Sequence, residues 1–453
     1  MAIWEKFAKY FGPRYSLFVA CLVHEVYFNI CLNAAWPSPV LAKLNRLDPE
    51  DNPLGRRVTD EESDLIGSLF FVGAAIGPLV IIVLVEKFGR KNVLDGLSLM
   101  IPIAYVVLTF TNDIDMYFIC RTVLGFYSGA ALSIQPVYLT EILPKEEKDF
   151  LMSLETVFNF MGILYAYAIA PAIPLFYFNL SVVIFAIFIF VLQAVACPSS
   201  PFDVMKSRGV EETRAVLQTL RNKEDVNAEL EEIRNIVITD SKKSYFDIFK
   251  SVDNWKALMV GTVPLIIQQW CGIPLLITYS QLIFNKTNIS ISSDMCSIIV
   301  VVFQVSTTFL TPVLLKCKTF TRKGLVILCL TLLGLCNLVL ALYFFYGLTI
   351  PALNWLPMVA LIAFVISYNC GIDSIPWIIM GEIYPTKISA VGSAISTSLF
   401  FGSIFPLLYS FRKVNIGYLF LTSFTDCVVG VLFFAFVYVN LKKSYRKGRN
   451  PNC

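Results

Sequence analysis

Two short stretches, far apart in the chain, each end an apolar run at a carboxylate that is followed by a proline. Residues 141–144 read Glu-Ile-Leu-Pro, and residues 382–385 read Glu-Ile-Tyr-Pro. A proline disfavours helical geometry in the residue before it, so each glutamate is expected where a helix leaves its packed surroundings. A carboxylate at the same place in two halves indicates an internal repeat, and in an apolar chain such a repeat points to a two-fold transporter.

A second charged motif lies at residues 86–91, which read Glu-Lys-Phe-Gly-Arg-Lys. A short glycine turn that carries Glu86 and the cations Arg90 and Lys91 can brace one helix end against another. The alternative is a basic loop that only sets membrane orientation. Its position after the second apolar run, together with Glu141 after the fourth, favours the bracing role.

Three ionisable side chains lie within apolar runs: His24, Glu25 and Asp373. A charge at the bilayer centre costs about 2.5–3.5 kcal/mol, so such groups normally face a cavity or have a partner. One interpretation is a proton site, with Asp373 or the His24–Glu25 pair titrating. The other is a set of satisfied polar contacts near helix ends.

The composition places these groups in a membrane protein. Of 453 residues 57% are hydrophobic and only 15% are charged, whereas a soluble domain carries about 25% charged residues. Apolar runs of about 20 residues recur, and each is long enough to cross a hydrocarbon core of about 30 Å. We expect twelve spans and an all-α membrane fold, with the spans near 15–38, 65–85, 93–111, 116–138, 152–174, 180–197, 256–282, 295–315, 324–347, 355–380, 389–410 and 415–440.

The placement of basic residues sets the expected orientation. With twelve spans, most Lys and Arg clusters fall in loops on one side, which the positive-inside rule makes cytoplasmic. Both termini are then cytoplasmic, although residues 40–64, on the outside, mix basic with acidic side chains. The same topology puts the N-glycosylation sequons at Asn285 and Asn288 outside.

One sustained polar segment divides the chain, and it contains two stretches with apolar residues at helical spacing, 210–221 and 230–237. We expect short amphipathic helices there. The predicted domains are a six-helix bundle at 1–197, a cytoplasmic helical linker at 198–255, a second six-helix bundle at 256–440 and a cytoplasmic tail at 441–453. No Walker-type nucleotide loop occurs, and the 12 cysteines include no C-x-x-C pair that would indicate a metal site.

In order along the chain, these motifs resemble the sugar-porter branch of the major facilitator superfamily, and most of all the insect facilitated trehalose transporters. The resemblance covers nearly the whole chain. It is carried by residues 86–91, Arg121, 136–141, 198–201, 268–273, 279–280 and 375–382.

The resemblance implies two six-helix bundles that rock around a central sugar site. It also implies a cytoplasmic clamp that closes when the site faces outward. Its expected members are Glu86, Arg90, Lys91, Arg121, Glu141, Lys148 and Glu382.

By the same resemblance, the substrate contacts are Gln268, Gln269 and Trp377, with Thr156 and Asn159 in the fifth span. The glutamines offer amide donors and acceptors to sugar hydroxyls, and the indole offers a ring face and an N–H donor. The alternative role for two glutamines in a span is hydrogen bonding between helices.

Several positions depart from the family pattern. Pro274 replaces an asparagine, and Phe400 and Phe401 replace an Asn-Trp pair, so hydroxyl partners are missing. Ser389 stands where the family has an arginine after the second glutamate. Our hypothesis is that Lys387 or Arg322 is the substitute partner of Glu382.

These observations favour facilitative transport (uniport) of a sugar such as trehalose or a hexose by alternating access. Two alternatives are a proton-coupled sugar symporter and a non-transporting sugar sensor with the same fold. The carboxylate typical of the symporters is absent from the first span, where Cys31 occupies its place. We expect no enzymatic activity, cofactor or metal, a monomer in the plasma membrane, and the sugar and the lipid bilayer as partners, with no nucleic acid.

Overall fold

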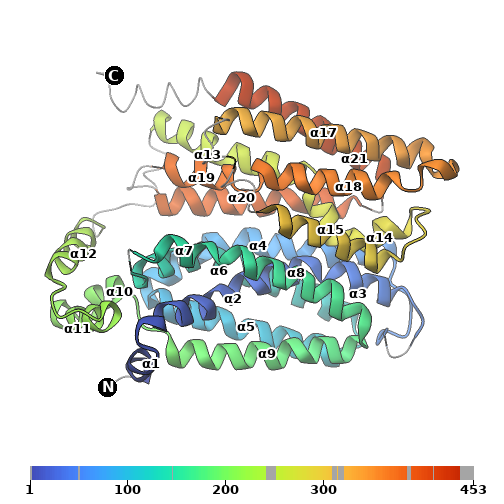
Figure 1. Cartoon of the computed structure of the whole chain (residues 1–453). Helices are drawn as coiled ribbons and strands as arrows, with labels where there is room; N and C mark the ends of the chain where they lie inside the picture. Colours follow the sequence, from blue (N-terminus) through green and yellow to red (C-terminus); the bar gives the residue numbers. More distant parts are fainter. Residues whose placement is uncertain are drawn as a thin grey trace.

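A computed structural model describes residues 3–48, 51–144, 146–240, 251–308, 314, 321–384, 389–411 and 413–438. These residues form helices, turns and connecting loops, and no strand occurs among them. Figure 1 shows the helices of the first half and those of the second half as two groups, side by side and with roughly parallel axes.

The first half begins with a short helix and continues with long ones. Its bounds are α1 Ile3–Phe11, α2 Tyr15–Ala35, α3 Pro37–Leu44, α4 Asp60–Phe88, α5 Arg90–Phe110, α6 Ile114–Ile142, α7 Lys148–Ser153, α8 Glu155–Ala172 and α9 Leu175–Ala196. Three short helices follow: α10 Pro201–Ser207, α11 Val210–Arg221 and α12 Asn227–Asp240.

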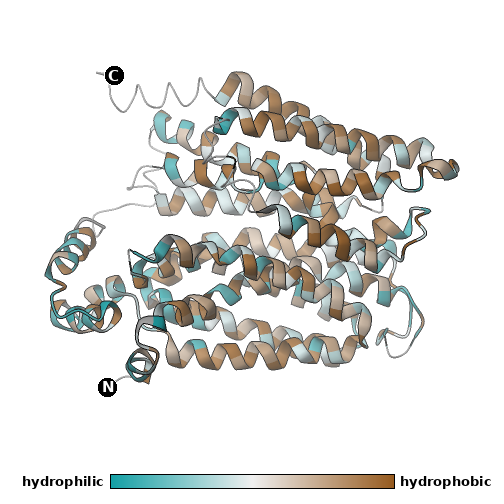
Figure 2. Ribbon diagram, in the orientation of Figure 1, coloured by the Kyte–Doolittle hydropathy of each residue, from teal (hydrophilic) through white to brown (hydrophobic). Residues whose placement is uncertain are grey.

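The second half contains α13 Val252–Trp270, α14 Ile273–Asn285, α15 Ser293–Thr308, α17 Arg322–Tyr346, α18 Leu356–Ser367, α19 Ile375–Ile383, α20 Ser389–Tyr409 and α21 Ile416–Leu432. Two π-helical turns interrupt or extend these helices, η5 Tyr368–Ile372 and η6 Phe433–Val437. Figure 2 shows mostly apolar residues along the long helices, with hydrophilic ones gathered at their ends and on α11 and α12.

The described residues contain 11 helical segments that are long and apolar enough to cross a membrane. The chain is therefore a multi-pass membrane protein. Where the eighth of the twelve predicted spans was expected, at 295–315, the structure has the shorter apolar helix Ser293–Thr307. Part of that predicted span lies outside the described residues, so the number twelve remains a prediction.

Small residues allow α4 and α6 to pack closely in the first half. A Cβ on Gly73 would lie 2.0 Å from the Thr122 carbonyl oxygen, and one on Gly129 would lie 2.0 Å from that of Ala74. A Cβ on Gly77 or on Gly125 would likewise lie only 2.5 Å or 1.8 Å, respectively, from a backbone oxygen across the interface. Pairs of glycines four residues apart let membrane helices approach at backbone distance. This close packing holds α6, which carries both Arg121 and Glu141, against α4.

The three helices that follow α9 form a small structure with its own apolar centre of Met205, Leu217, Val226, Leu230 and Ile233. Arg221 attaches it to the first half, because its guanidinium donates to the Ile142 carbonyl oxygen at 2.7 Å and pairs with Glu229 at 2.7 Å. Carbonyls at a helix C-terminus lack intrahelical donors, so Arg221 caps α6. We call this end of the molecule, with α10–α12, the linker end, and the opposite end the far end.

Candidate functional site

A large cavity of about 1520 Å³ lies between the two halves. Residues of α2, α4, α6 and α8 line it on one side, and residues of α13, α14, α15, α19 and α20 on the other. It extends to exposed residues at the end of α4 and at the end of α10, so it reaches the surface at the linker end.

At the far end the two halves are in direct contact. The Tyr167 hydroxyl donates to the Ile277 carbonyl oxygen at 2.5 Å, and the backbone N–H of Gln281 donates to the Ser38 hydroxyl at 3.0 Å. Tyr279 is fully buried and packs against Gly67 of α4. The cavity is therefore closed at the far end and open at the linker end.

Gln268, the first of the predicted substrate contacts, lies between two places where a helix is interrupted. Between α13 and α14, Gly272 has a φ of +108°, which favours glycine, and Asn337 donates to the Cys271 carbonyl oxygen at 2.9 Å. Between η5 and α19 the helix is interrupted before Pro376, which has no backbone N–H. The Gln268 amide nitrogen donates to the Asp373 carbonyl oxygen at 2.9 Å and so joins the two breaks.

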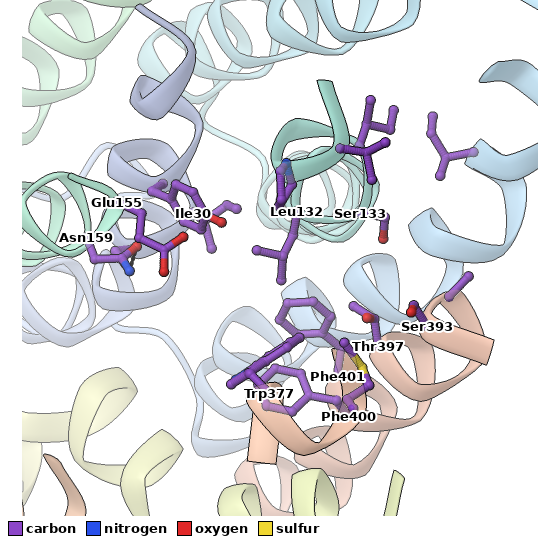
Figure 3. A pocket seen from close by; sticks show the side chains of 18 of the residues that line it. Ile30, Leu132, Ser133, Glu155, Asn159, Trp377, Ser393, Thr397, Phe400 and Phe401 are labelled. Atoms are coloured by element: carbon purple, nitrogen blue, oxygen red, sulfur yellow. Dashed lines mark hydrogen bonds between the residues drawn. The ribbon is translucent and has the colours of Figure 1, made fainter. Parts of the chain in front are cut away.

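The aromatic wall of the cavity comes from α19 and α20. The rings of Trp377 and Phe400 meet edge to face with their centroids 5.0 Å apart, and Phe401 lies 4.9 Å from Phe400. Figure 3 shows these three rings together on one side of the cavity. Phe400 and Phe401, read from the sequence as lost polar partners, instead form an apolar surface around the tryptophan.

Polar groups from α8 lie on the opposite side of the cavity in Figure 3, where Glu155 and Asn159 are labelled. The Asn159 amide oxygen accepts from the Cys31 thiol at 3.2 Å. Thr156 and Gln269 also line the cavity. The structure thus brings together all five predicted substrate contacts, Gln268, Gln269, Trp377, Thr156 and Asn159. Glu155, which lines the same cavity, was not among the predicted site residues.

At the linker end, Arg90 is the centre of a charged cluster. Its guanidinium lies 3.1 Å from Glu141 and 2.7 Å from Asp203, and its backbone N–H donates to Asp203 at 2.6 Å. Ser200 also donates to Glu141. Because Arg90 is the first residue of α5, the Asp203 carboxylate caps that helix. Sequence reasoning missed Asp203, which lies 113 residues away from Arg90.

Glu86 and Lys91, two other predicted clamp residues of the first half, line the cavity near this cluster but have different contacts. Lys91 pairs with Asp95 at 2.7 Å and donates to the Ala194 carbonyl oxygen at 3.1 Å, so it braces α5 against α9. Glu86 is exposed at the linker end of the cavity. Within the described part of the chain, neither Glu86 nor Lys148 forms an ion pair.

Arg121 does not belong to the clamp with which the sequence grouped it. It lies 20 residues before Glu141 on α6, about 30 Å along the helix axis at 1.5 Å per residue. It is fully buried, donates to the carbonyl oxygens of Ile66 at 2.9 Å and Asn33 at 2.7 Å, and lies 4.8 Å from the Phe70 ring. Arg121 therefore holds α2, α4 and α6 together toward the far end.

In the second half, Glu382 pairs with Arg322, whose Nη1 lies 2.7 Å and 2.8 Å from the two carboxylate oxygens. Arg322 was one of the two substitute partners suggested by the sequence, and the other, Lys387, lies outside the described residues. Among the described residues no ion pair joins the two halves at the linker end. The clusters around Glu141 and Glu382 are separate, as expected for a cavity open at this end.

The three ionisable residues of the spans have different surroundings. Asp373 lines the cavity. His24 is buried, with Nδ1 3.1 Å from the Gln135 amide nitrogen and Nε2 2.8 Å from the Leu151 carbonyl oxygen. The amide donates and the carbonyl accepts, which fits a neutral imidazole with both nitrogens satisfied. Glu25 is buried against Asn29. Neither His24 nor Glu25 lines the cavity.

Both predicted glycosylation residues are exposed at the far end, where α14 ends. Asn285 is the last residue of that helix, and the side chain of Asn288 donates to the Leu348 carbonyl oxygen at 2.8 Å. Their exposure is compatible with modification, which remains a prediction.

A two-part helical membrane fold around one central cavity is the architecture of a membrane transporter. Residues 39–447 match the family described as "Sugar (and other) transporter". The chain belongs to that family, within the major facilitator superfamily, and it is not an enzyme. The resemblance inferred from the motifs is thereby confirmed.

Insect relatives match most of the chain. It is 27% identical over 436 residues to the facilitated trehalose transporter Tret1 of Bombyx mori, covering 93% of this chain and 83% of the relative. It is 28% identical over 373 residues to Tret1 of Polypedilum vanderplanki, covering 79% of this chain and 72% of the relative. Among solved structures, the xylose transporter XylE of E. coli, in a partially occluded inward-open conformation, superposes with a TM-score of 0.76 at 18% identity and covers 94% of this chain and 98% of its own.

Proposed function

We propose that this protein transports a sugar such as trehalose or a hexose by facilitative uniport. The observation that carries the proposal is the cavity of about 1520 Å³, lined by both halves and by all five expected substrate contacts. Neutral amides and an indole suit an uncharged polyhydroxylated molecule. The insect relatives named as trehalose transporters support the same class of substrate.

Transport in this proposal follows from moving one half against the other. In the present arrangement the contacts of Tyr167 and Ser38 close the far end. The opposite arrangement would separate these contacts and bring the Glu141 and Glu382 clusters together at the linker end. Each cluster contains one arginine and one glutamate, Arg90 with Glu141 and Arg322 with Glu382. The carboxylate of one cluster could therefore pair with the arginine of the other.

The proposed topology places the linker end in the cytoplasm, with α10–α12 as a cytoplasmic linker and with both chain termini on that side. The basic residues of the linker end support this orientation. We further propose a monomer in the plasma membrane, because the two halves of the same chain together line the cavity.

A proton-coupled symporter is the alternative that a specific observation favours, because Asp373 lines the cavity. Uptake of labelled sugar into proteoliposomes separates the alternatives. A uniporter equilibrates the sugar at the same rate with and without an imposed pH gradient, whereas a symporter accumulates it. A sensor binds sugar without flux. Absence of both flux and binding for a panel of disaccharides and hexoses would refute the proposal.

A further inference from the structure

Two carboxylates from opposite halves face the central cavity. Glu155 is the first residue of α8, and Asp373 lies between η5 and α19. Both are partly exposed and line the cavity, and they are close enough to interact electrostatically. Carboxylates accept hydrogen bonds from hydroxyl groups, but two of them facing one cavity also attract positive charge.

Neither carboxylate has a cationic partner among the residues that the structure describes. Their polar neighbours are hydroxyl groups, Tyr27 beside Glu155 and Tyr368 beside Asp373. The cationic residues that line the cavity all fall within 87–91 and 206–208, at its linker end. Unpaired charge inside a membrane protein is unfavourable, so such groups normally have a partner. A cation that enters the cavity would supply this partner, because the two tyrosine hydroxyls carry no charge.

An independent observation indicates that the substrate has a hydrogen-bond donor at the same place. Gln268 is only 2% exposed and lines the cavity, yet its amide oxygen has no hydrogen-bond partner. The orientation of the amide is fixed, because its nitrogen donates to the Tyr368 hydroxyl and to the Asp373 carbonyl oxygen, both at 2.9 Å. The vacant group is therefore an acceptor, and only a donor can satisfy it.

The aromatic wall adds a further attraction for positive charge. Trp377 and Phe400 lie across the cavity from Glu155 in Figure 3. Aromatic ring faces attract cations, and indole does so most strongly. Carboxylates, an orphan acceptor and ring faces together match an ammonium group, while Gln269, Asn159 and Thr156 suit hydroxyls.

We propose that the preferred substrate carries a protonated amine on a sugar-sized, hydroxyl-bearing body, and that Glu155, Asp373 and Gln268 bind the amine. This inference rests on the proposed transport function and narrows its substrate. The charge of the substrate can be tested by its accumulation, because a membrane potential drives the uptake of a monovalent cation but not that of a neutral sugar.

The test uses the full chain in proteoliposomes, with glucosamine buffered so that its amine is protonated, and with glucose and N-acetylglucosamine as neutral probes. An inside-negative potential of about 100 mV is expected to accumulate glucosamine about 50-fold and to leave both neutral probes at equilibrium. Glu155→Gln and Asp373→Asn are each expected to lower the preference for glucosamine over glucose at least about tenfold. The control is Asp426→Asn, which removes a carboxylate of α21 that does not line the cavity and should preserve the preference.

Thermal stabilisation of the purified protein provides a readout that does not depend on flux. Stabilisation by glucosamine but not by glucose supports the inference even if no probe is transported, in which case only the proposed function fails. Equal stabilisation by both probes, or stabilisation by neither, overturns it. Equal transport of both probes, driven by an imposed pH gradient, also overturns it, because the carboxylates then carry protons.

Discussion

Replacing Gly67 with alanine tests whether close contact at the far end holds the cavity open toward the linker end. Gly67 lies on α4 and faces Tyr279 of the second half. A Cβ at Gly67 would lie 2.1 Å from the Tyr279 hydroxyl oxygen and 2.7 Å from the ring carbon that carries it. Tyr279 has little room to withdraw, because it is fully buried and stacks on Phe411 with the ring centroids 4.1 Å apart.

The expected effect follows from that distance. Ordinary contact begins at 3.4 Å, so the hydroxyl and the new methyl group must separate by a further 1.3 Å. Overpacking of this kind costs about 1–3 kcal/mol. Since about 1.4 kcal/mol corresponds to a tenfold change in an equilibrium constant, the far-end-closed state should lose about 5- to 140-fold in relative population.

Reaction of Cys31 with a membrane-impermeant thiol reagent measures this shift. Cys31 lines the cavity and is partly exposed. In oriented proteoliposomes the wild-type protein should react when the reagent is added at the linker side. The Gly67→Ala variant should also react from the far side. The Cys31→Ser variant should lose this part of the signal and leave only the labelling of the other eleven cysteines.

Gly96→Ala is the matched control for the same change on a helix of the same half. No heavy atom lies within 4 Å of the position that a Cβ on Gly96 would occupy. This variant should therefore keep the wild-type labelling pattern. The reasoning is refuted if Gly67→Ala reacts only from the linker side and melts at the same temperature as Gly96→Ala.

Three further predictions address stability, the clamp and topology. Gly129→Ala should destabilise the protein by several kcal/mol, because its Cβ would lie 2.0 Å from a backbone oxygen of α4. An unchanged melting temperature would show that α4 and α6 do not pack this closely. Arg322→Glu should slow sugar uptake, and the reversal Arg322→Glu/Glu382→Arg should restore it, since the pair has a contact of 2.7 Å; failure of the double variant to recover would argue against the pairing. Expression in eukaryotic cells should give a glycosidase-sensitive mass shift that Asn285→Gln/Asn288→Gln abolishes, and a shift that persists in this double variant would contradict the proposed topology.

Local sequence patterns predicted most of the helices and the family. Apolar runs of membrane-spanning length and helical spacing at 210–221 are properties of short segments, and α11 begins and ends at those residues. The motif at 86–91 likewise identified the cluster around Arg90. The five substrate contacts came from resemblance, and folding places them around one cavity.

Contacts between distant segments account for what the sequence did not reveal. Asp203 meets Arg90 only because α10 folds back beneath α5. Arg121 was grouped with Glu141 by motif, but 20 residues of continuous helix separate them. The neutral role of His24 depends on Gln135 and Leu151, each more than 100 residues away. No local pattern encodes which polar groups will be paired and which will face a cavity.

Counterflow in proteoliposomes tests the central claim of alternating-access transport most directly. Vesicles that contain the protein are preloaded with an unlabelled sugar and diluted into a trace of the same sugar in labelled form, with trehalose, glucose and glucosamine assayed in parallel. A carrier predicts transient accumulation of label above equilibrium for at least one of them, without any imposed gradient of protons. Binding of sugar with no label entering beyond that in protein-free vesicles would contradict the account.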